Sequence, residues 1–450
     1  MKITIPQQAA NIIKTLSSHG FEAYVVGGCV RDSILGKTPS DWDITTSARP
    51  QQVKALFPRT IDTGIQHGTV TIMMGKTGYE VTTYRIDGTY EDHRRPTEVT
   101  FTSSLKEDLM RRDFTINAMA YNDTQGLVDL FGGEKDLNAR IIRCVGNPME
   151  RFNEDALRML RAVRFAGQLN FTIEKETWYA MKACHPLLKD VSAERIQMEL
   201  LKLLISNHPE TLKEAYLTGL TGVFLPEFDR MMDTPQNNPH HVYSVGEHTL
   251  HALESVPPNP VLRLTMLLHD MGKPQTRSTD EEGIDHFYRH NEVSASMSRQ
   301  ILKRLKFDNR TIQMVTTLIA HHDIRFQDPL GSGKRHVRKV MHSVGENLFP
   351  YLLDVMEADI CAQSDFMRLK KLSILKETRQ ACREIIDAGD CLSLKDLKIN
   401  GNQLKALGIR EGKVIGAILN TLLSFVLENP ECNEYETLKE MALKILRELP

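Results

Sequence analysis

Strand-forming patterns are concentrated in the first third of this 450-residue chain. The runs at 21–28, 68–74 and 79–86 are rich in valine, threonine, tyrosine and other residues that favour strands. After about Pro148 the pattern changes, because apolar residues recur at helical spacing in segments such as ALRMLRAVRFAGQL (156–169). The sequence therefore predicts an α/β head followed by a body made of helices.

The helical part divides further by composition. Residues 235–239 contain two prolines and two asparagines, which is typical of a linker, and the segment that follows holds most of the sixteen histidines. At roughly 150 residues per domain, the length suggests about three domains. We predict a head over 1–147, a helical neck and body over 148–235, a histidine-rich helical domain over 240–370 and a helical tail over 371–450.

The overall charge argues against a general polyanion binder, because 56 basic and 58 acidic residues leave a formal net charge of −2. Any affinity for nucleic acid must then come from local basic patches. The seven cysteines include no CxxC pair, so we expect reduced thiols and a cytoplasmic location. The N-terminal residues lack a signal-peptide core. The apolar run from Val414 to Leu427 is too short to span a membrane and is expected to form a buried helix.

Two carboxylates, two residues apart, follow a glycine pair in the head. On a strand, Asp41 and Asp43 would project from one face, and two such carboxylates can hold two Mg²⁺ ions for a phosphoryl transfer. Upstream, Gly28 lets the backbone approach a phosphate, and Arg31 can bind triphosphate oxygens with its guanidinium. Each motif alone is more often a turn or a solvated acidic loop. Together, in this order, they predict a nucleotidyl-transfer site.

A second candidate site lies in RFNEDALRMLRAVRF (151–165). If this stretch is one regular helix, Asp155 and Arg158 are neighbours, whereas Asp155 and Arg164 face opposite sides. A carboxylate acceptor beside a guanidinium donor matches the edge that cytosine and adenine share, an NH₂ group next to a ring nitrogen. Such a pair in isolation is usually a surface ion pair. Next to the head motifs, it predicts a base reader that accepts C and A without a nucleic-acid template.

The strings GGCVRD, DWD, RRDFTINAMA, LVDLFGG, EDALR and SAERIQMEL, in this order between about residues 20 and 230, resemble those of class II, bacterial-type CCA-adding tRNA nucleotidyltransferases. The resemblance implies a nucleotidyltransferase head with a five-stranded mixed sheet, a neck that reads the base, and a body and tail that hold tRNA. It further implies template-independent addition of C, C and A to the tRNA 3′ end by two-metal transfer, with release of pyrophosphate. The expected partners are tRNA, CTP and ATP, and the expected cofactor of the head is Mg²⁺.

Carried over motif by motif, the resemblance assigns catalysis and Mg²⁺ binding to Asp41 and Asp43. It assigns nucleotide binding to Gly28, Arg31, Arg112, Asp155, Arg158, Arg161 and Arg164. Within this set, Asp155 and Arg158 are the implied base-reading pair. Glu194 and Arg195 are expected to brace the base-reading helix rather than touch substrate. The loop from Asp87 to Val99 resembles the element that helps the switch from C to A addition.

The histidine-rich segment carries a second ordered pattern. His248, the pair His269–Asp270 and the distant Asp359 resemble the ligands of the HD phosphohydrolase superfamily. The resemblance implies these four as ligands of a divalent metal of unspecified identity, with His290 and His321 as candidates for a second metal. A metal bound there can activate water against a phosphate ester, and 2′,3′-cyclic or 2′-phosphates at RNA ends are the implied substrates. The alternative is a helical module that only carries tRNA.

Other functions fit parts of the same sequence. A poly(A) polymerase, or a tRNA nucleotidyltransferase that adds only A or only CC, would use the same head chemistry. A tail of mixed charge and the HD pattern favour tRNA over poly(A) synthesis. A phosphohydrolase whose head only delivers RNA, and a non-catalytic RNA-binding scaffold, are disfavoured because both sets of metal ligands are intact.

Overall fold

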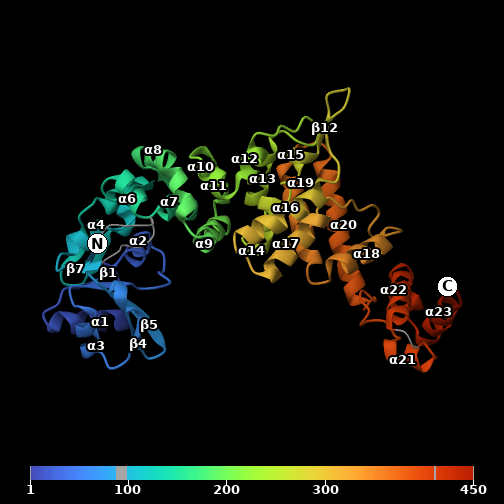
Figure 1. Cartoon of the computed structure of the whole chain (residues 1–450), viewed down its shortest axis with the longest axis horizontal. Helices are drawn as coiled ribbons and strands as arrows, with labels where there is room; N and C mark the ends of the chain where they lie inside the picture. Colours follow the sequence, from blue (N-terminus) through green and yellow to red (C-terminus); the bar gives the residue numbers. More distant parts are fainter. Residues whose placement is uncertain (1, 88–98, 410–411, 449–450) are drawn as a thin grey trace. The chain divides into compact units, whose positions relative to one another are not determined.

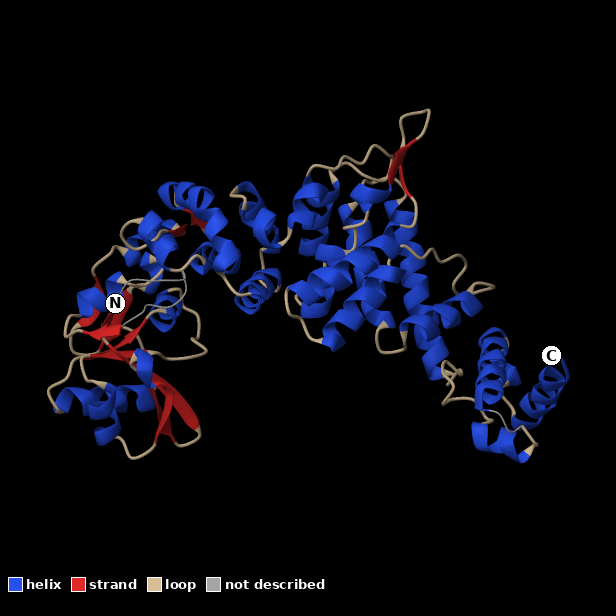
Figure 2. Cartoon of the chain, viewed as in Figure 1, coloured by secondary structure: helices blue, strands red, loops and turns tan. Residues whose placement is uncertain are grey.

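The chain folds into two compact units, Met1–Pro226 and Glu227–Pro450, in a computed structural model that describes residues 2–87, 99–409 and 412–448 (Figure 1). Strands gather in the first unit, and the described part of the second unit is helical apart from one two-stranded ladder (Figure 2). The prediction of an α/β head followed by a mostly helical body is therefore confirmed.

One mixed sheet forms the head, with the strand order β3-β4-β5-β2-β1-β8-β9. β2 and β5 run parallel, with Ile44 opposite Val81, and the other pairs of this sheet are antiparallel. The strand AYVV is buried along its whole length, which explains its unbroken apolar run. The strands are β1 (Ala23–Val26), β2 (Ile44–Thr46), β3 (Thr60–Gly64), β4 (Thr69–Met74), β5 (Thr77–Thr83), β8 (Met119–Asn122) and β9 (Gly126–Asp129).

The sheet has seven strands where five were expected, so that prediction was wrong in its count. Both edge strands are short. β3 reads TIDTG and is largely exposed, and β9 reads GLVD and is only partly buried. Edge strands of this kind carry little of the apolar alternation by which strands are recognised in a sequence.

Helices on the head position its functional loops. α1 packs against β1 and β2 through Ala9, Ile12, Ile13 and Leu16, which recur at helical spacing. α2 follows β1 directly and packs against β1 and β8. The ladder of β6 (Arg85–Asp87) and β7 (Val99–Phe101) flanks residues 88–98, so the loop predicted to help the switch from C to A lies mostly outside the described residues. The helices are α1 (Gln7–Ser18), α2 (Gly28–Ile34), α3 (Pro50–Leu56), α4 (Leu105–Met110) and α5 (Gly133–Ala139).

The helix predicted over residues 151–165 is in fact two helices. α6 (Pro148–Glu154) and α7 (Leu157–Leu169) are separated by Asp155, whose backbone is extended at φ −143° and ψ 101°. Its carboxylate accepts a hydrogen bond of 3.1 Å from the first N–H of α7, as a capping aspartate does. The regular helical spacing expected across this stretch was therefore wrong.

The rest of the first unit packs around α7, which contacts α9 and α10. α9 buries Ile196, Leu200, Leu203 and Leu204 on one face, together with the carboxylate of Glu199. The remaining elements of this unit are β10 (Ile141–Ile142), β11 (Thr172–Ile173), α8 (Lys175–Cys184), α9 (Ala193–Leu204), α10 (Leu212–Leu217) and α11 (Leu220–Phe224).

The second unit is built from helices, and one apolar core cluster runs from Leu318 to Ala442 through α18, α19, α20 and α22. Because α20 spans Arg368–Asp387, the predicted boundary at 370/371 falls inside a helix. The helices are α12 (Pro226–Met232), which crosses the unit boundary, α13 (Val245–Ser255), α14 (Pro260–Leu268), α15 (Lys273–Thr276), α16 (His290–Arg304), α17 (Asn309–His321), α18 (Lys334–Val344), α19 (Phe349–Ala362), α20, α21 (Gly401–Ala406), α22 (Gly412–Glu428) and α23 (Tyr435–Glu448); the ladder is β12 (Arg277–Thr279) with β13 (Asp285–Phe287).

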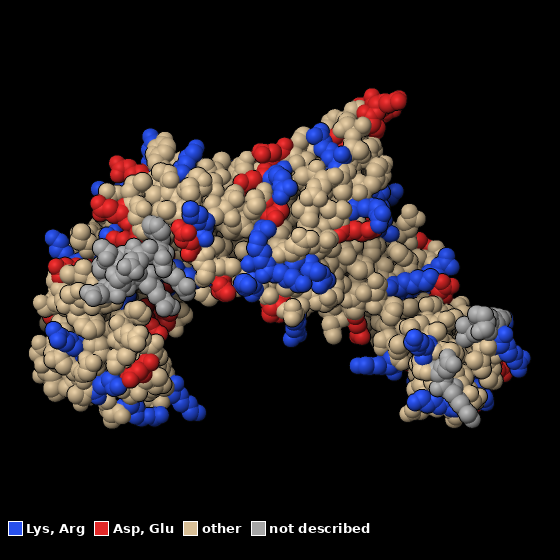
Figure 3. Space-filling model, in the orientation of Figure 1, with Lys and Arg blue, Asp and Glu red and all other residues tan. Residues whose placement is uncertain are grey.

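The apolar run near the C-terminus forms α22, which buries Ile415, Ile418, Leu422 and Val426 as predicted. Within the described residues, none of the helices combines the length and the apolar character needed to cross a membrane. Basic and acidic side chains alternate over the visible surface, with one group of lysines and arginines over α14–α17 (Figure 3). α16, α17 and the turn between them expose Arg299, Lys303, Lys306 and Arg310.

Candidate functional site

The aspartate pair of the head lies in the loop that leads into β2, so the expectation that both residues stand on a strand was wrong. The carbonyl of Asp43 still accepts a hydrogen bond from Val26 of β1, at 3.0 Å, which fixes the loop against the sheet. Partial burial and the charge of Asp41 raise the pKa of Asp43 to about 6, although the charge of Arg112 acts in the opposite direction. A carboxylate whose pKa is raised by a second carboxylate beside it marks a site where a divalent cation would relieve the repulsion.

The glycine pair brings two predicted arginines to the start of α2. Gly27 has φ of 80°, and a Cβ atom there would lie 3.0 Å from Nη1 of Arg112, so glycine is required for this approach. Arg31 on α2 donates from Nη1 to Oδ1 of Asn117 at 2.7 Å and from Nε to Asp32 at 2.8 Å. Gly28, Arg31 and Arg112 therefore lie around one turn.

The break between α6 and α7 forms one wall of a cavity of about 230 Å³. The predicted base-reading residues Asp155 and Arg158 both line it, although they are not on one helix. Nη2 and Nη1 of Arg195 lie 2.8 and 3.2 Å from the two oxygens of Asp155. Arg158 donates to Glu154 at 2.6 Å and to the carbonyl of Arg111 at 2.8 Å. The cavity is lined by Arg111, Arg112, Asp113, Asp155, Arg158, Arg161 and Arg195.

Arg195 was expected to brace the base-reading helix rather than touch substrate, and two contacts describe its position. It binds Asp155, and it also lines the cavity. Arg161 lines the same cavity and donates from Nε to the buried Asp113 at 2.8 Å. Burial by itself raises the pKa of Asp113, but Arg161 and Asn117 lower it to about 2. Arg164 is outside the lining and pairs instead with Glu199.

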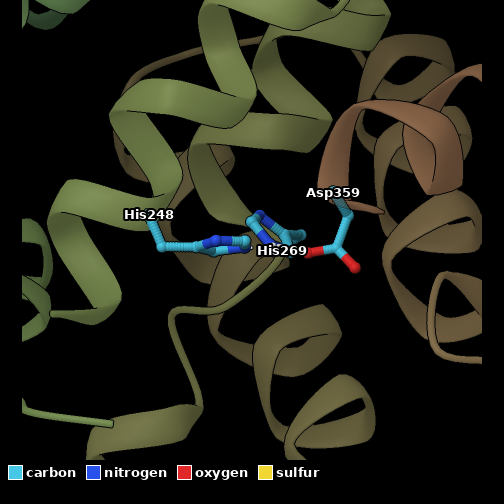
Figure 4. Close-up of side chains that lie close together, drawn as sticks. All are labelled: His248, His269 and Asp359. Atoms are coloured by element: carbon cyan, nitrogen blue, oxygen red, sulfur yellow. Dashed lines mark hydrogen bonds and ion pairs between the residues drawn. The ribbon is translucent and has the colours of Figure 1, made fainter. Parts of the chain in front are cut away.

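A second cluster of buried polar groups lies in the second unit (Figure 4). His248 is on α13, His269 directly follows α14, and Asp359 is on α19. Nε2 of His248 and Nε2 of His269 lie 2.8 and 3.7 Å from the same oxygen of Asp359. Oδ2 of Asp270 lies 3.1 Å from Nε2 of His269 and 3.9 Å from that of His248. The structure thus brings the four predicted ligands together.

Four imidazoles in this cluster are oriented in the same way. Each places its Nδ1 against a backbone carbonyl, which turns its Nε2 towards the cluster. The partners are Ala362 for His248 at 3.3 Å, Met266 for His269 at 2.7 Å, Phe287 for His290 at 2.9 Å and Ile319 for His322 at 2.7 Å. This orientation is the one that metal-binding histidines have.

Of the two histidines predicted as candidates for a second metal, one lies outside the cluster. His290 lies in the cluster, but His321 does not, because its Nε2 contacts the hydroxyl of Ser343 at 2.8 Å. His322 takes that place, with Nε2 3.2 Å from Nε2 of His290 and 3.7 Å from Oδ1 of Asp270. The two Nε2 atoms face one another beside Oδ1 of Asp270, an arrangement that a shared cation would satisfy.

The buried nitrogen and oxygen atoms of this cluster fit a divalent cation. Nε2 of His269 and both oxygens of Asp270 are buried and make ion-pair contacts, yet they have no hydrogen bond of standard geometry within the described part of the chain. Burial by itself raises the pKa of Asp270, but His269 and Lys273 hold it well below its ordinary value. Cavities of about 460 and 710 Å³ open onto Asp359 and His322, and both are lined by Arg325.

Comparison with known proteins identifies the family. Residues 23–143 match the poly A polymerase head domain, 170–232 match the probable RNA and SrmB-binding site of polymerase A, and 276–442 match domain 2 of tRNA nucleotidyltransferases. The chain is 39% identical over 423 residues to the CCA-adding enzyme of Levilactobacillus brevis, which covers 92% of each chain. The chain belongs to the CCA-adding enzymes.

Two further CCA-adding enzymes match nearly the whole chain. That of Ligilactobacillus salivarius is 34% identical over 450 residues and covers 98% of this chain and 97% of its own. The crystal structure of the Bacillus stearothermophilus CCA-adding enzyme in complex with CTP superimposes with a TM-score of 0.73 at 29% identity, over 99% of this chain and 98% of that one. The mixed-sheet head and the mostly helical body are thus those of CCA-adding enzymes, and membership implies the use of divalent metal in the head.

The family matches also bear on the second unit. The match over 276–442 includes Asp359 and runs through the predicted boundary at 370/371 as one tRNA nucleotidyltransferase domain. The HD resemblance of His248, His269, Asp270 and Asp359 therefore stays a prediction within a CCA-adding enzyme.

Several residues of these sites were missed from the sequence. Asn117 stands in the RRDFTINAMA motif, which would have marked it, and Glu154 stands beside Asp155 in EDALR. Glu199, which binds Arg164, is the next-to-last residue of the SAERIQMEL motif. Helical phase would have favoured His322, because it lies four residues after the buried Leu318 and seven after the buried Val315.

Proposed function

We propose that this chain adds C, C and A to the 3′ end of tRNA from CTP and ATP, without a nucleic-acid template, and releases pyrophosphate. The observation that carries the proposal is the cavity at the α6–α7 break, where Asp155 and Arg158 face the same space as Arg112. Arg112 in turn reaches Gly27 and the charge of Asp43 in the head. A base reader and a candidate metal site are thereby linked through one arginine.

In the proposed reaction, the terminal 3′-hydroxyl of tRNA attacks the α-phosphorus of the bound nucleotide, and the bond to the pyrophosphate oxygen breaks. Asp41 and Asp43 would hold Mg²⁺, which supplies charge neutralisation at the attacking and leaving oxygens. Arg31 and Arg112, at the glycine turn, bind the negatively charged triphosphate. Asp155 accepts from the exocyclic amino group of cytosine or adenine, and Arg158 donates to the ring nitrogen beside it.

Rejection of G and U follows from the same two groups. Guanine and uracil present a carbonyl where C and A present an amino group, so the ionised Asp155 would face an oxygen and Arg158 a ring N–H. Each buried group left without a partner then carries a penalty of roughly 1–3 kcal/mol. The reader needs no template because both accepted bases share one hydrogen-bonding pattern.

For tRNA binding, we propose the helical parts of the chain, with neck and body at 148–235 and the tail at 371–450. The exposed cations of α16 and α17, among them Arg299, Lys303 and Arg310, supply a local basic surface for RNA phosphates. All seven cysteines are free thiols, which supports the prediction of a cytoplasmic enzyme.

The test is an addition assay with purified protein, Mg²⁺ and tRNA transcripts that lack CCA, end in CC or are complete. Stepwise incorporation of C, C and A that then stops is the expected result. Addition of A only to the CC-ended transcript would make this an A-adding enzyme, and a stop at CC would make it a CC-adding one. Long A tails would indicate a poly(A) polymerase.

A second activity is proposed for the cluster of His248, His269, Asp270 and Asp359, namely metal-dependent hydrolysis of 2′,3′-cyclic or 2′-phosphates at RNA ends. Four Nε2 atoms and two carboxylates that converge in a buried site support it. A bound divalent metal supplies activation of water, and Lys273 and Arg325 line the cavity where a phosphate would lie. Release of phosphate, or ring opening, from an RNA with a 2′,3′-cyclic end tests it, with His248→Ala as the inactive variant.

A further inference from the structure

We propose that Phe165 and Asn117 are positioning residues that couple the triphosphate-binding arginine of the head to the arginines of α7, and this rests on the nucleotide addition proposed above. Neither residue was assigned a role by the sequence motifs. Phe165 is on α7 and Asn117 follows α4 in the head, yet both contact Arg31.

The ring of Phe165 is a common platform for three guanidinium groups. The guanidinium carbons of Arg31, Arg161 and Arg164 lie 5.1, 5.5 and 3.8 Å from its centroid, all within the distance at which a cation is attracted to an aromatic ring. The ring is only 6% exposed, which strengthens this attraction. Its position is fixed in turn by an edge-to-face contact with Phe114, with centroids 5.8 Å apart at 82°.

A hydrogen-bonded path runs parallel to this platform. Oδ1 of Asn117 accepts from Arg31 at 2.7 Å, and its Nδ2 donates to Oδ1 of Asp113 at 3.1 Å. Oδ2 of Asp113 accepts from Nε of Arg161 at 2.8 Å. Arg31 and Arg161 are therefore connected twice, once through an amide and a carboxylate and once through an aromatic ring.

Each arginine also has its own carboxylate, so the three like charges can gather without a net repulsion. Arg31 pairs with Asp32, Arg161 with Asp113 and Arg164 with Glu199. These ion pairs balance the positive charge of the three arginines. The ring and the Asn117 amide add to the contacts that hold the guanidinium planes, and a fixed plane favours a two-point contact with phosphate oxygens.

A specific kinetic consequence follows. Phe165→Leu keeps every ion pair and removes the ring, so the guanidinium groups lose their shared orientation before the nucleotide binds. KM for CTP on a transcript lacking CCA, and KM for ATP on a CC-ended transcript, should both rise about tenfold. kcat at saturating nucleotide should stay within about threefold, because the candidate metal site is untouched.

The variants distinguish positioning from packing. Phe165→Tyr retains the ring and should restore KM to near the wild-type value, whereas Asn117→Ala, which leaves the core intact, should raise it. The double variant should raise KM more than either single variant, because it removes both connections to Arg31. Phe57→Leu removes a buried ring at the end of α3 and serves as the control. A purely structural role lowers the fraction of active protein, and hence kcat, without changing KM.

The proposal is overturned if Phe165→Leu and Asn117→Ala both keep KM within twofold of wild type, or if Phe57→Leu raises KM to the same extent. Wild-type protein that adds neither nucleotide would instead overturn the proposed function. The Kd for CTP, measured by calorimetry on the same variants, then tests the positioning role without catalysis, and an unchanged Kd would reject it.

Discussion

The guanidinium of Arg195 binds both carboxylate oxygens of Asp155, with Nη2 2.8 Å from one oxygen and Nη1 3.2 Å from the other. This pair joins α9 to the break between α6 and α7. A forked contact holds the plane of a carboxylate, and so determines which lone pairs remain for a third group. The residue expected to brace a helix therefore sets the orientation of the proposed base reader itself.

Removal of the two-point contact between Arg195 and Asp155 should reduce the selectivity for the correct base. We expect Arg195→Ala to lower kcat/KM for CTP and ATP by roughly 10- to 100-fold, the range for loss of one charge-assisted pair, and to raise UMP incorporation. Arg195→Lys should recover only part of the lost kcat/KM, because an ammonium group cannot bind both carboxylate oxygens in one plane. Lys202→Ala, an exposed change on α9, is the control in single-turnover addition assays. Selectivity equal to wild type in Arg195→Ala would place base orientation elsewhere.

Substitution of either candidate metal-binding aspartate of the head should reduce nucleotide addition more than substitution of Arg195. Asp41→Ala and Asp43→Ala should each reduce nucleotide addition by about 10³-fold or more, since neither variant can hold the proposed Mg²⁺ that neutralises developing charge. Asp62→Ala removes a surface carboxylate of the head, which pairs with Lys54 at 2.9 Å, and should leave the rate unchanged. Circular dichroism establishes that all three remain folded. Appreciable addition by Asp41→Ala would contradict the metal assignment.

Local sequence pattern predicted much of the secondary structure, because the periodicity of strands and helices depends on neighbouring residues. The order of the head motifs along the chain was enough to group Gly28, Arg31, Asp41 and Asp43 in one candidate site, although the two aspartates lie in a loop and not on a strand. The break at Asp155 was missed, since DALR fits helical spacing equally well. An aspartate before an apolar helical run is also a capping signal, and the structure uses it in that way.

Contacts between residues that are far apart in the sequence could not be predicted from local periodicity. The set of Arg31, Asn117, Asp113 and Arg161 is assembled by packing of α7 against the head, which no periodicity records. The choice of His321 over His322 was an error of helical phase. A step of one residue turns a helix by 100°, and it moved the prediction from the buried face of α17 to Thr317 and Ser343.

Stability without metal should depend on pH through Asp43. Partial burial and the charge of Asp41 raise its pKa from 3.8 to about 6, so the folded chain binds a proton more tightly than the unfolded chain. The stability from this proton is fully present below the unfolded pKa and is lost as pH rises through about 6. In the presence of EDTA, Asp43→Asn should therefore raise Tm relative to wild type at pH 8 and have little effect at pH 4. An equal difference in Tm at both values would show that Asp43 titrates normally.

The histidine–aspartate cluster should bind a divalent metal independently of the head. In an Asp41→Ala background, Mn²⁺ added to metal-stripped protein should raise Tm, with about 2.7 kcal/mol of stabilisation at a concentration of 100 times Kd. His248→Ala should abolish most of this gain, because its Nε2 lies in the cluster, 2.8 Å from Oδ1 of Asp359.

The neighbouring histidines provide a matched comparison in the same titration. His322→Ala should weaken Mn²⁺ binding, since His322 lies within the cluster, 3.2 Å from His290. His321→Ala should not, because His321 contacts Ser343 instead. If calorimetry finds equal affinity in the wild-type cluster, His248→Ala and His322→Ala, the convergence of Nε2 atoms is only a buried polar network. A loss in His248→Ala and His322→Ala that spares His321→Ala would assign His248 and His322 to the metal site and place His321 outside it.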